Sequence, residues 1–254
     1  MIVIKTAAEI ASMRRAGRVV ATLLQDVGAK VRPGVTTLEL DQLAGQVLER
    51  QGATSPFIGY QPAQARKPYP GYTCMSVNEQ VVHGVPGTRR LVDGDILTID
   101  CGALLDGWVA DGAWTFAVGT IGAEARELLQ VTEQALYAAI AASRNGNQSG
   151  DVGAAMQKVV EAHGFNVIRE HTSHGVGREL HEDPHIPNHG KAGTGLRLRT
   201  GMTIAMEPMV LAGHYATQLL DDEWTVAAKD GRLTAHFEHT IAIQDGDAEI
   251  LTRL

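Results

Sequence analysis

Two long apolar runs flank the dipeptide Asp106-Gly107, and they constrain the fold of this chain more than any other stretch. The segment 93–119, DGDILTIDCGALLDGWVADGAWTFAVG, is rich in strand-forming residues, and Asp-Gly is a strong signal for a hairpin turn. In such a hairpin the numbers of facing residues sum to 213 (106 + 107), so Asp111 lies opposite position 102. Asp100 then points to the same face, which makes the two aspartates diagonal neighbours with backbones about 7–8 Å apart.

Two further acids lie in strand-like segments nearer the C-terminus. In segment 200–213, the alternation of side chains places Glu207 on the face opposite the apolar residues. In segment 232–243, Glu238 and His236 share the face opposite a row of apolar side chains. Each acid therefore belongs to a stretch whose other residues predict a core strand.

Four acids embedded in apolar strands need compensation, because a buried carboxylate requires hydrogen bonds, a partner or a metal ion. A single acid of this kind, such as Asp100 taken alone, is a solvated surface charge as often as it is a functional group. Lys and Arg are nearly absent from these strands, which disfavours internal salt bridges and leaves cations as the natural partners. Four carboxylates offset the charge of two divalent ions, and one or two imidazoles would complete a site for Mn, Fe, Co or Zn.

Four amphipathic helices are predicted from apolar residues at helical spacing. They cover residues 8–27, about 38–51, 123–143 and 151–163. Gly52 and Gly164 directly follow the second and the fourth, where a glycine C-cap is expected. Because no linker divides the chain, we predict one α+β domain over residues 1–254, with antiparallel strand pairing.

The two predicted helix pairs are spaced alike. Eighteen residues separate Gly34 from Gly52, and eighteen separate Gly146 from Gly164. This spacing predicts an internal repeat of two structural halves, although any two helices can be aligned in this way by chance. The halves would be about 1–120 and 121–254.

Composition and charge narrow the class of protein. The chain of 254 residues carries a net charge of −7, which argues against nucleic acid and anionic membranes as partners. No apolar run approaches the roughly 20 residues that span a bilayer, and the start, MIVIKTAAEIASMRRAG, lacks the pattern of a signal peptide. Cys74 and Cys101 form neither a disulfide framework nor a CxxC pair, so a reduced, cytoplasmic setting is predicted.

Five ordered motifs together resemble those of the type I methionine aminopeptidases. They are SVNEQVVHGVP, GDILTIDCGALLDGWVADGAWTF, HGVGRELHEDPHIPNHG, GMTIAMEPMV and AHFEHTIAI. Each motif is weak alone, but their order and gaps extend the resemblance over essentially the whole chain. The resemblance implies the pita-bread metallopeptidase fold, in which an antiparallel sheet carries helices on its outer face. It also implies the short bacterial form, with nothing preceding the catalytic domain.

The resemblance also implies the residues of a dinuclear metal site. Two divalent ions (Co, Mn, Fe or Zn) would be held by Asp100, Asp111, His174, Glu207 and Glu238. By the same resemblance, a hydroxide that bridges the ions attacks the first peptide bond and releases an N-terminal methionine that precedes a small residue. The family's catalytic roles fall on His83, His181 and Glu207, with Glu207 as the proton shuttle and both histidines touching the substrate.

A pocket for the methionine side chain is implied in the same way. The matching positions are Cys74, Tyr69, Trp224, Leu180 and Tyr60. Leu180 stands where the family commonly has phenylalanine, and the loop 61–70 is longer than usual, which places the two tyrosines in question. Without the resemblance, Trp224 would be interpreted as a half-buried strand aromatic.

No motif role falls on His171 or His185, and we expect His171 to be a structural histidine with its hydrogen bonds satisfied. The expected partners are the N-termini of nascent polypeptides, with transient ribosome contact, and the expected state is a monomer. Two alternatives remain open from sequence. One is an Xaa-Pro aminopeptidase or prolidase, which usually carries an additional N-terminal domain. The other is a catalytically silent relative that binds protein or nucleic acid, although such proteins typically lose metal ligands.

Overall fold

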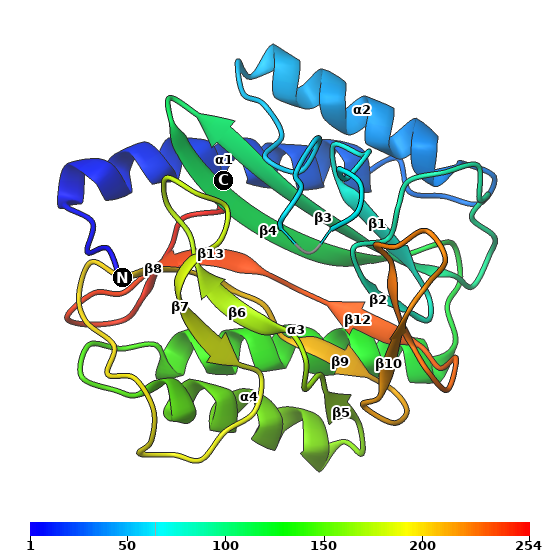
Figure 1. The fold of residues 1–254 in the computed structure, drawn as a ribbon. Coiled ribbons are helices and arrows are strands. Elements are labelled where there is room, and N and C mark those ends of the chain that lie inside the picture. Colours follow the sequence, from blue (N-terminus) through cyan, green and yellow to red (C-terminus); the bar gives the residue numbers. More distant parts are fainter. Residues whose placement is uncertain (64) are drawn as a thin grey trace.

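The computed structural model describes residues 1–63 and 65–254, and its helices enclose a layer of antiparallel strands (Figure 1). The helices are α1 (Ala7–Gly28), α2 (Thr37–Arg50), α3 (Ala123–Ala142) and α4 (Ser149–Ala162). The strands are β1 (Cys74–Val77), β2 (Gln80–Val82), β3 (Ile96–Leu105), β4 (Trp108–Ala117), β5 (Asn166–Val167), β6 (Thr172–Gly175), β7 (Glu182–Pro187), β8 (Thr203–Met206), β9 (Met209–Leu211), β10 (Thr217–Leu219), β11 (Val226–Ala228), β12 (Thr234–His236), β13 (His239–Ala242) and β14 (Glu249–Ile250). All four predicted helices are confirmed to within one or two residues at either end.

Local sequence explains where the first two helices begin. The Thr6 hydroxyl accepts a hydrogen bond from the Glu9 amide, and the Glu9 carboxylate accepts one from the Thr6 amide at 2.8 Å. Thr36 and Glu39 form the same reciprocal pair at the start of α2. These capping boxes satisfy amide groups that a helix start leaves without partners.

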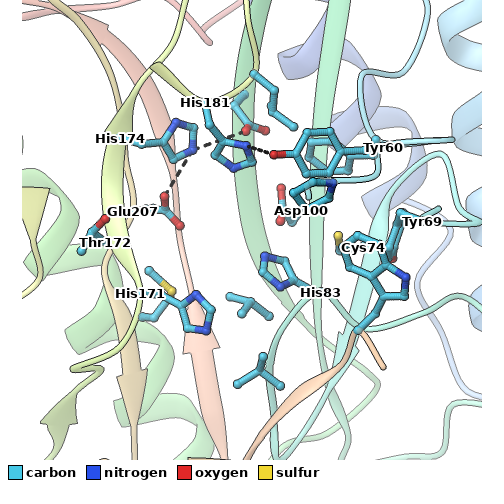
Figure 2. A pocket seen from close by; sticks show the side chains of 18 of the residues that line it. Tyr60, Tyr69, Cys74, His83, Asp100, His171, Thr172, His174, His181 and Glu207 are labelled. Atoms are coloured by element: carbon cyan, nitrogen blue, oxygen red, sulfur yellow. Dashed lines mark hydrogen bonds and ion pairs between the residues drawn. The ribbon is translucent and has the colours of Figure 1, made fainter. Parts of the chain in front are cut away.

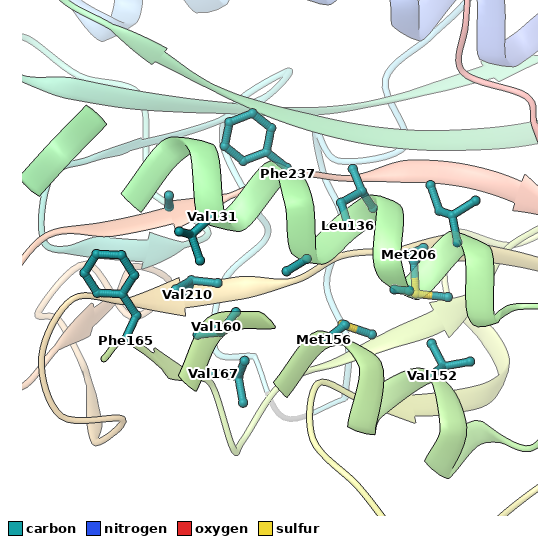
Figure 3. Close-up of a cluster of buried hydrophobic side chains, with 14 of the residues drawn as sticks. Val131, Leu136, Val152, Met156, Val160, Phe165, Val167, Met206, Val210 and Phe237 are labelled. Carbon is teal, nitrogen blue, oxygen red and sulfur yellow. The ribbon is translucent and has the colours of Figure 1, made fainter. Parts of the chain in front are cut away.

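The apolar helix faces form two separate cores on opposite sides of the strands. Figure 1 shows α1 and α2 on one side and α3 and α4 on the other. The first core joins α1 and α2 to β1, β3 and β4. The second joins α3 and α4 to residues of β8, β9 and β12, with Met156, Val210 and Phe237 among its members (Figure 3).

The predicted internal repeat is visible in the backbone. Gly34 and Gly146 precede α2 and α4 with the same φ of 91°, and Gly52 and Gly164 follow those helices with φ of 66° and 77°. Residues with a Cβ rarely adopt such angles, so the two glycine pairs mark equivalent turns. The shared conformation supports a repeated helix pair rather than a chance alignment.

The predicted hairpin is confirmed in its register. β3 and β4 pair antiparallel over ten residue pairs, and Gly102 lies directly opposite Asp111. Asp100 pairs with Ala113 and, on its other side, with Cys74 of β1. The hairpin therefore brings both aspartates to one face of a three-stranded sheet, in the order β1-β3-β4.

The segments 200–213 and 232–243 were each predicted as one extended run, and each is broken in two. β8 ends before Glu207 and β9 begins after Pro208, while β12 and β13 flank Phe237 and Glu238. Pro208 has no amide hydrogen to continue a ladder. At Glu238 the backbone pairs instead with Ala113 of β4, donating to its carbonyl at 2.8 Å. Both breaks fall at the predicted metal ligands.

The breaks divide the strands among four small antiparallel sheets. Their strand orders are β1-β3-β4, β10-β11-β2, β12-β9-β5 and β14-β13-β8-β6-β7. Among the helices in the described ranges, none combines the length and apolar character required to cross a membrane. Of the loop 61–70, Gln64 lies outside the described residues.

Candidate metal centre and active site

A cavity of about 660 Å³ lies among the strands and is lined by residues from both halves of the chain (Figure 2). Its size suits a small-molecule or peptide-end ligand. It brings together all twelve residues that the sequence indicated as site residues. They are Tyr60, Tyr69, Cys74, His83, Asp100, Asp111, His174, Leu180, His181, Glu207, Trp224 and Glu238.

Acids from four different segments meet in this cavity. Asp100 and Asp111 come from the β3–β4 hairpin, and Glu207 and Glu238 come from the two strand breaks. Asp111 is 4 % exposed and Glu238 is 2 % exposed, so these carboxylates are removed from solvent. The Glu207 amide donates to Ser173 Oγ at 3.0 Å, which holds the backbone of that ligand against β6.

His174 points one ring nitrogen at the acids (Figure 2). Its Nε2 lies 3.5 Å from Glu207 Oε1 and 3.9 Å from Asp111 Oδ2. Its Nδ1 lies 2.9 Å from the carbonyl oxygen of Gly175 and can donate a proton to it. Such a bond leaves the lone pair on Nε2, which is the usual arrangement of a metal-binding histidine. A Cβ at Gly175 would lie 2.1 Å from the Asp183 carbonyl oxygen, so this turn requires glycine.

The acids destabilise one another's charged forms. Burial, followed by the neighbouring carboxylates, raises the pKa of Asp100, Glu207 and Glu238 well above the ordinary range. Burial alone raises the pKa of Asp111 to about 7. Asp100 Oδ1 and Glu238 Oε1 have no hydrogen-bond partner within the described chain. Within the described residues, histidines are the only basic side chains that pair with any of the four acids.

These observations fit divalent metal ions. Unpaired buried carboxylate oxygens, facing one another and flanked by imidazole nitrogens, form the donor set that such ions prefer. Two groups of side chains have ligand atoms within 4.8 Å of one another, and they share Glu238. The groups are Asp111, His174 and Glu238, and Glu207, His236 and Glu238.

His236 is the one member of these groups that sequence reasoning did not assign. It is 1 % exposed, and its Nε2 lies 3.5 Å from Glu207 Oε2 and 3.8 Å from Glu238 Oε2. Burial, with smaller effects from nearby histidines, lowers the pKa of His236 to about 3. The alternation in segment 232–243 correctly put it on the face of Glu238, and that shared face was the available signal.

The carboxylate cluster predicts how stability depends on pH once metal is removed. Above about pH 7 most histidines are neutral in both the folded and the unfolded chain, because their unfolded pKa is about 6.5, so the carboxyls dominate the pH dependence. A carboxyl whose pKa is raised by folding stabilises the fold while protonated, and that stability is lost as pH rises through its folded pKa. For Asp111 this pKa is about 7. The free energy of unfolding of chelator-treated protein should therefore fall from about pH 7 upward.

Urea unfolding with excess chelator, at a series of pH values, measures this dependence. The variant Asp111→Asn lacks one of the titrating groups and is expected to show a shallower fall. Saturating metal should restore the unfolding midpoint at the higher pH values, because bound cations compensate the charges. A midpoint that rises over this range in metal-free protein would contradict the prediction.

His181 lies between His174 and Tyr60 at the cavity (Figure 2). Its Nδ1 lies 2.9 Å from the Tyr60 hydroxyl, and its ring centroid lies 4.4 Å from that of His174. Burial, with a smaller effect from His185, lowers the pKa of His181 to about 4. The imidazole is therefore neutral at physiological pH and presents one N–H as a hydrogen-bond donor.

His83 lies at the end of β2 in a left-handed conformation, with φ of 58°. This backbone angle is strained for a residue other than glycine. Residues with such strain are concentrated at functional sites. Burial, with smaller effects from His171 and His181, lowers the pKa of His83 to about 3. The ring of His171 packs edge-on against His83 at 5.5 Å and also lines the cavity. No hydrogen bond joins the ring of His171 to the described residues, and the side chain is partly exposed, so its structural role stays a prediction.

An aromatic and sulfur-containing wall lies beside Asp100. Tyr69 and Trp224 meet edge to face with centroids 5.2 Å apart, and Cys74 is buried beside them. The Tyr69 hydroxyl donates to the Gly84 carbonyl at 2.8 Å. The Tyr69 amide donates to the Tyr60 carbonyl at 2.9 Å, and the Gly59 amide donates to the Tyr69 carbonyl at 2.8 Å. These bonds close the base of the long loop, so both tyrosines remain at the cavity.

A buried ion pair anchors the turn that carries His181. Lys5 Nζ lies 2.5 Å from Glu182 Oε2, and the two side chains are 1 % and 12 % exposed. The other Glu182 oxygen accepts hydrogen bonds from the amides of Arg178 and Glu179. The N-terminal segment therefore holds the turn between β6 and β7 in place.

Replacing Lys5 with Met should lower the free energy of unfolding by about 3 kcal/mol, because it leaves a largely buried carboxylate without its cation. Urea unfolding of the metal-loaded protein measures the change. Arg15→Met is a matched control, since Arg15 pairs with Asp106 while both side chains are more than half exposed. An equal loss in the two variants would show that burial of the Lys5 pair has no special effect.

The sequence and the structure both match known metallopeptidases. The family model described as Metallopeptidase family M24 matches residues 11–245. Methionine aminopeptidase 1 of Bacillus subtilis is 46 % identical over 254 residues, all of both chains. The crystal structure of methionine aminopeptidase from Thermotoga maritima superposes with a TM-score of 0.96 and 44 % identity, covering all of both chains.

A more distant structure supports the fold alone. Prolidase from Pyrococcus furiosus gives a TM-score of 0.77 at 22 % identity, and the match covers 99 % of this chain and 65 % of that one. The α+β pita-bread architecture predicted from the sequence is thus confirmed by these neighbours. Family model, full-length relatives and superposed structures agree, and the chain belongs to metallopeptidase family M24.

Proposed function

We propose that this chain is a metal-dependent methionine aminopeptidase that removes the N-terminal methionine from nascent polypeptides whose second residue is small. The carrying observation is the convergence of five potential metal ligands in a cavity that is also lined by an aromatic and sulfur-containing wall. Full-length similarity to enzymes named methionine aminopeptidase, at 46 % and 45 % identity for two of them, supports the same activity.

The proposed cofactor is a pair of divalent ions per chain, Co, Mn, Fe or Zn. The residues that would hold them are Asp100, Asp111, His174, Glu207 and Glu238. When bound, such ions supply Lewis acidity for a carbonyl group and lower the pKa of a water nucleophile. Glu238 belongs to both ligand groups, so its carboxylate would help to hold metal in either group.

In this proposal, Glu207 moves the proton. Its side chain lines the cavity and is 12 % exposed, so its carboxylate can reach a bound peptide. The carboxylate takes the proton of the attacking water and passes it to the nitrogen of the departing amine. Ser173 and its hydrogen bond to the Glu207 amide keep this group in place.

His181 and His83 are proposed to bind the scissile peptide. When the Tyr60 hydroxyl donates to His181 Nδ1, the proton of the neutral ring resides on Nε2. That N–H can donate to the oxygen on which charge develops during attack. His83 is proposed to contact the amide nitrogen side of the same bond, and its unusual backbone conformation supports a functional role.

The methionine side chain is proposed to lie against the wall formed by Tyr60, Tyr69, Cys74, Leu180 and Trp224. Aromatic edges and sulfur suit a polarizable thioether, and buried apolar surface favours an unbranched side chain. Tyr69 and Trp224 are locked against each other at 5.2 Å, which preorganises the wall before substrate arrives. Leu180 is 7 % exposed and completes it beside His181.

The cellular setting follows from this activity. We propose that residues 1–254 act as one catalytic domain of two halves, as a monomer in the cytoplasm. Nascent chains would be its partners, with transient contact to the ribosome. The net charge of −7 supports action without binding nucleic acid or membrane.

A peptide-cleavage assay tests the proposal. Metal-stripped protein is reconstituted in turn with Mn, Fe, Co and Zn and given Met-Ala-Ser or an Ala-Pro peptide. We expect metal-dependent release of methionine from the first peptide and no cleavage of the second. Cleavage of Ala-Pro alone would favour a prolidase-like enzyme, and absence of any metal-dependent cleavage would favour a catalytically silent binding protein.

A further inference from the structure

The buried side chain of His236 lies behind the carboxylates and has no role in the mechanism above. It ends β12, and the cavity lining does not include it, whereas Glu207 and Glu238 both line the cavity. Neither of its ring nitrogens has a hydrogen-bond partner among the described residues. A buried imidazole without any partner is destabilising, so the ring calls for a ligand.

The geometry points to that ligand. We propose that His236 is an additional metal ligand, which binds one ion of the centre through Nε2 together with Glu207 and Glu238. The inference rests on the proposed dinuclear metal site and adds a residue to it. It also assigns one imidazole to each of the two ligand groups, His174 with Asp111 and His236 with Glu207.

The arrangement around Glu207 supports the assignment. Its Oε1 lies 3.5 Å from His174 Nε2, and its Oε2 lies 3.5 Å from His236 Nε2. The carboxylate is therefore placed between two imidazoles, with one nitrogen at each oxygen. Glu238 Oε2 lies 3.8 Å from the same nitrogen of His236, so that nitrogen faces two acids at once.

The backbone holds His236 in this position. Its amide donates to Thr115 Oγ1 at 3.0 Å, and its carbonyl accepts from the same hydroxyl at 2.8 Å. The Thr98 and Thr115 hydroxyls also lie 2.9 Å apart across the β3–β4 hairpin. Because hydrogen bonds hold both the amide and the carbonyl of His236, its backbone has little freedom to move. A preorganised metal ligand requires such a fixed position.

A simple hydrogen bond from His236 to one acid is the competing explanation. Both nitrogen–oxygen distances, 3.5 Å and 3.8 Å, exceed those of normal N–H···O bonds. A single N–H can also satisfy only one of the two carboxylates that face it. A cation shared by the three side chains satisfies both carboxylates and the Nε2 of His236, and every one of their ligand atoms lies within 4.8 Å of the others.

Proton NMR of the cobalt-loaded full chain tests the proposal without reference to activity. Each imidazole bound to paramagnetic Co(II) gives one strongly shifted ring N–H signal, which is present in H2O and absent in D2O. We expect two such signals in the unaltered protein, assigned to histidine by ¹⁵N labelling. His236→Gln should remove one signal, whereas His239→Gln should retain both, because the His239 ring contacts Thr252 instead of the acids.

Calorimetric titration of metal-stripped protein provides the second measurement. We expect His236→Gln to bind the more weakly held Co(II) or Mn(II) at least about 10-fold less tightly, with His239→Gln unchanged. One signal in the unaltered protein, or two in His236→Gln, would overturn the inference and leave the metal centre intact. No shifted signal at all would overturn the centre itself. The number of shifted signals in the unaltered protein tests the inference even if a variant fails to fold.

Discussion

Asp111→Asn is expected to lower kcat/KM for a Met-Ala-Ser peptide by at least about a thousandfold, roughly 4 kcal/mol of transition-state stabilisation. Asp111 lies in the centre of the β3–β4 hairpin, is 4 % exposed and faces His174 at 3.9 Å. The amide of asparagine fills the same space but carries no charge to hold a cation. The variant should therefore lose metal and activity together.

Elemental analysis of the purified variant, alongside peptide-cleavage rates at saturating metal, measures both losses. Asp106→Asn is the matched control, because it makes the same change at the exposed turn of the same hairpin. We expect this control to keep full metal content and activity. Asp111→Asn with unchanged metal content and near-normal kcat/KM would contradict a ligand role for Asp111.

His181→Ala is expected to lower kcat by about 10²–10³-fold while the metal content stays intact. The neutral ring lies at the cavity with Nδ1 2.9 Å from the Tyr60 hydroxyl, and it belongs to neither ligand group. Its proposed contribution is a donor to the developing negative charge, and alanine cannot supply one. A similar loss is expected for His83→Ala.

Steady-state kinetics and metal analysis on the same preparations separate these roles. Tyr60→Phe keeps the ring of His181 but removes its hydroxyl partner, and it should reduce kcat by less than the alanine variant. His163→Ala, at the exposed end of α4, serves as the histidine control. If His181→Ala loses metal along with activity, the assignment of this residue to the substrate is wrong.

The convergence of Asp100 and Asp111 could be predicted from sequence because strand geometry is simple. Side chains alternate with a period of two, so the Asp106-Gly107 turn determines every pairing in the hairpin, and Gly102 does lie opposite Asp111. The helices could be predicted equally well, since capping residues and apolar periodicity are local signals. The functional roles came from the family resemblance rather than from these local rules.

The interrupted strands and His236 could not be predicted, since both depend on distant contacts. The backbone of Glu238 leaves its ladder to pair with Ala113, which lies more than one hundred residues away in sequence. Alternation placed His236 and Thr240 on the same face, but only the folded chain shows which of them meets Glu207. Thr240 instead bonds the backbone of Asp111 through its hydroxyl.

Two backbone hydrogen bonds, from Tyr69 to Tyr60 and from Gly59 to Tyr69, close the base of the loop between the tyrosines, and we call this pair of bonds the clasp. Because the clasp is closed by backbone groups, it does not depend on the side chains of the residues between the two tyrosines. Loop closure becomes only slightly less favourable as a loop grows. Pro62 and Ala65 of the same loop line the cavity, so a small fluorophore attached to this segment would report on arriving peptides.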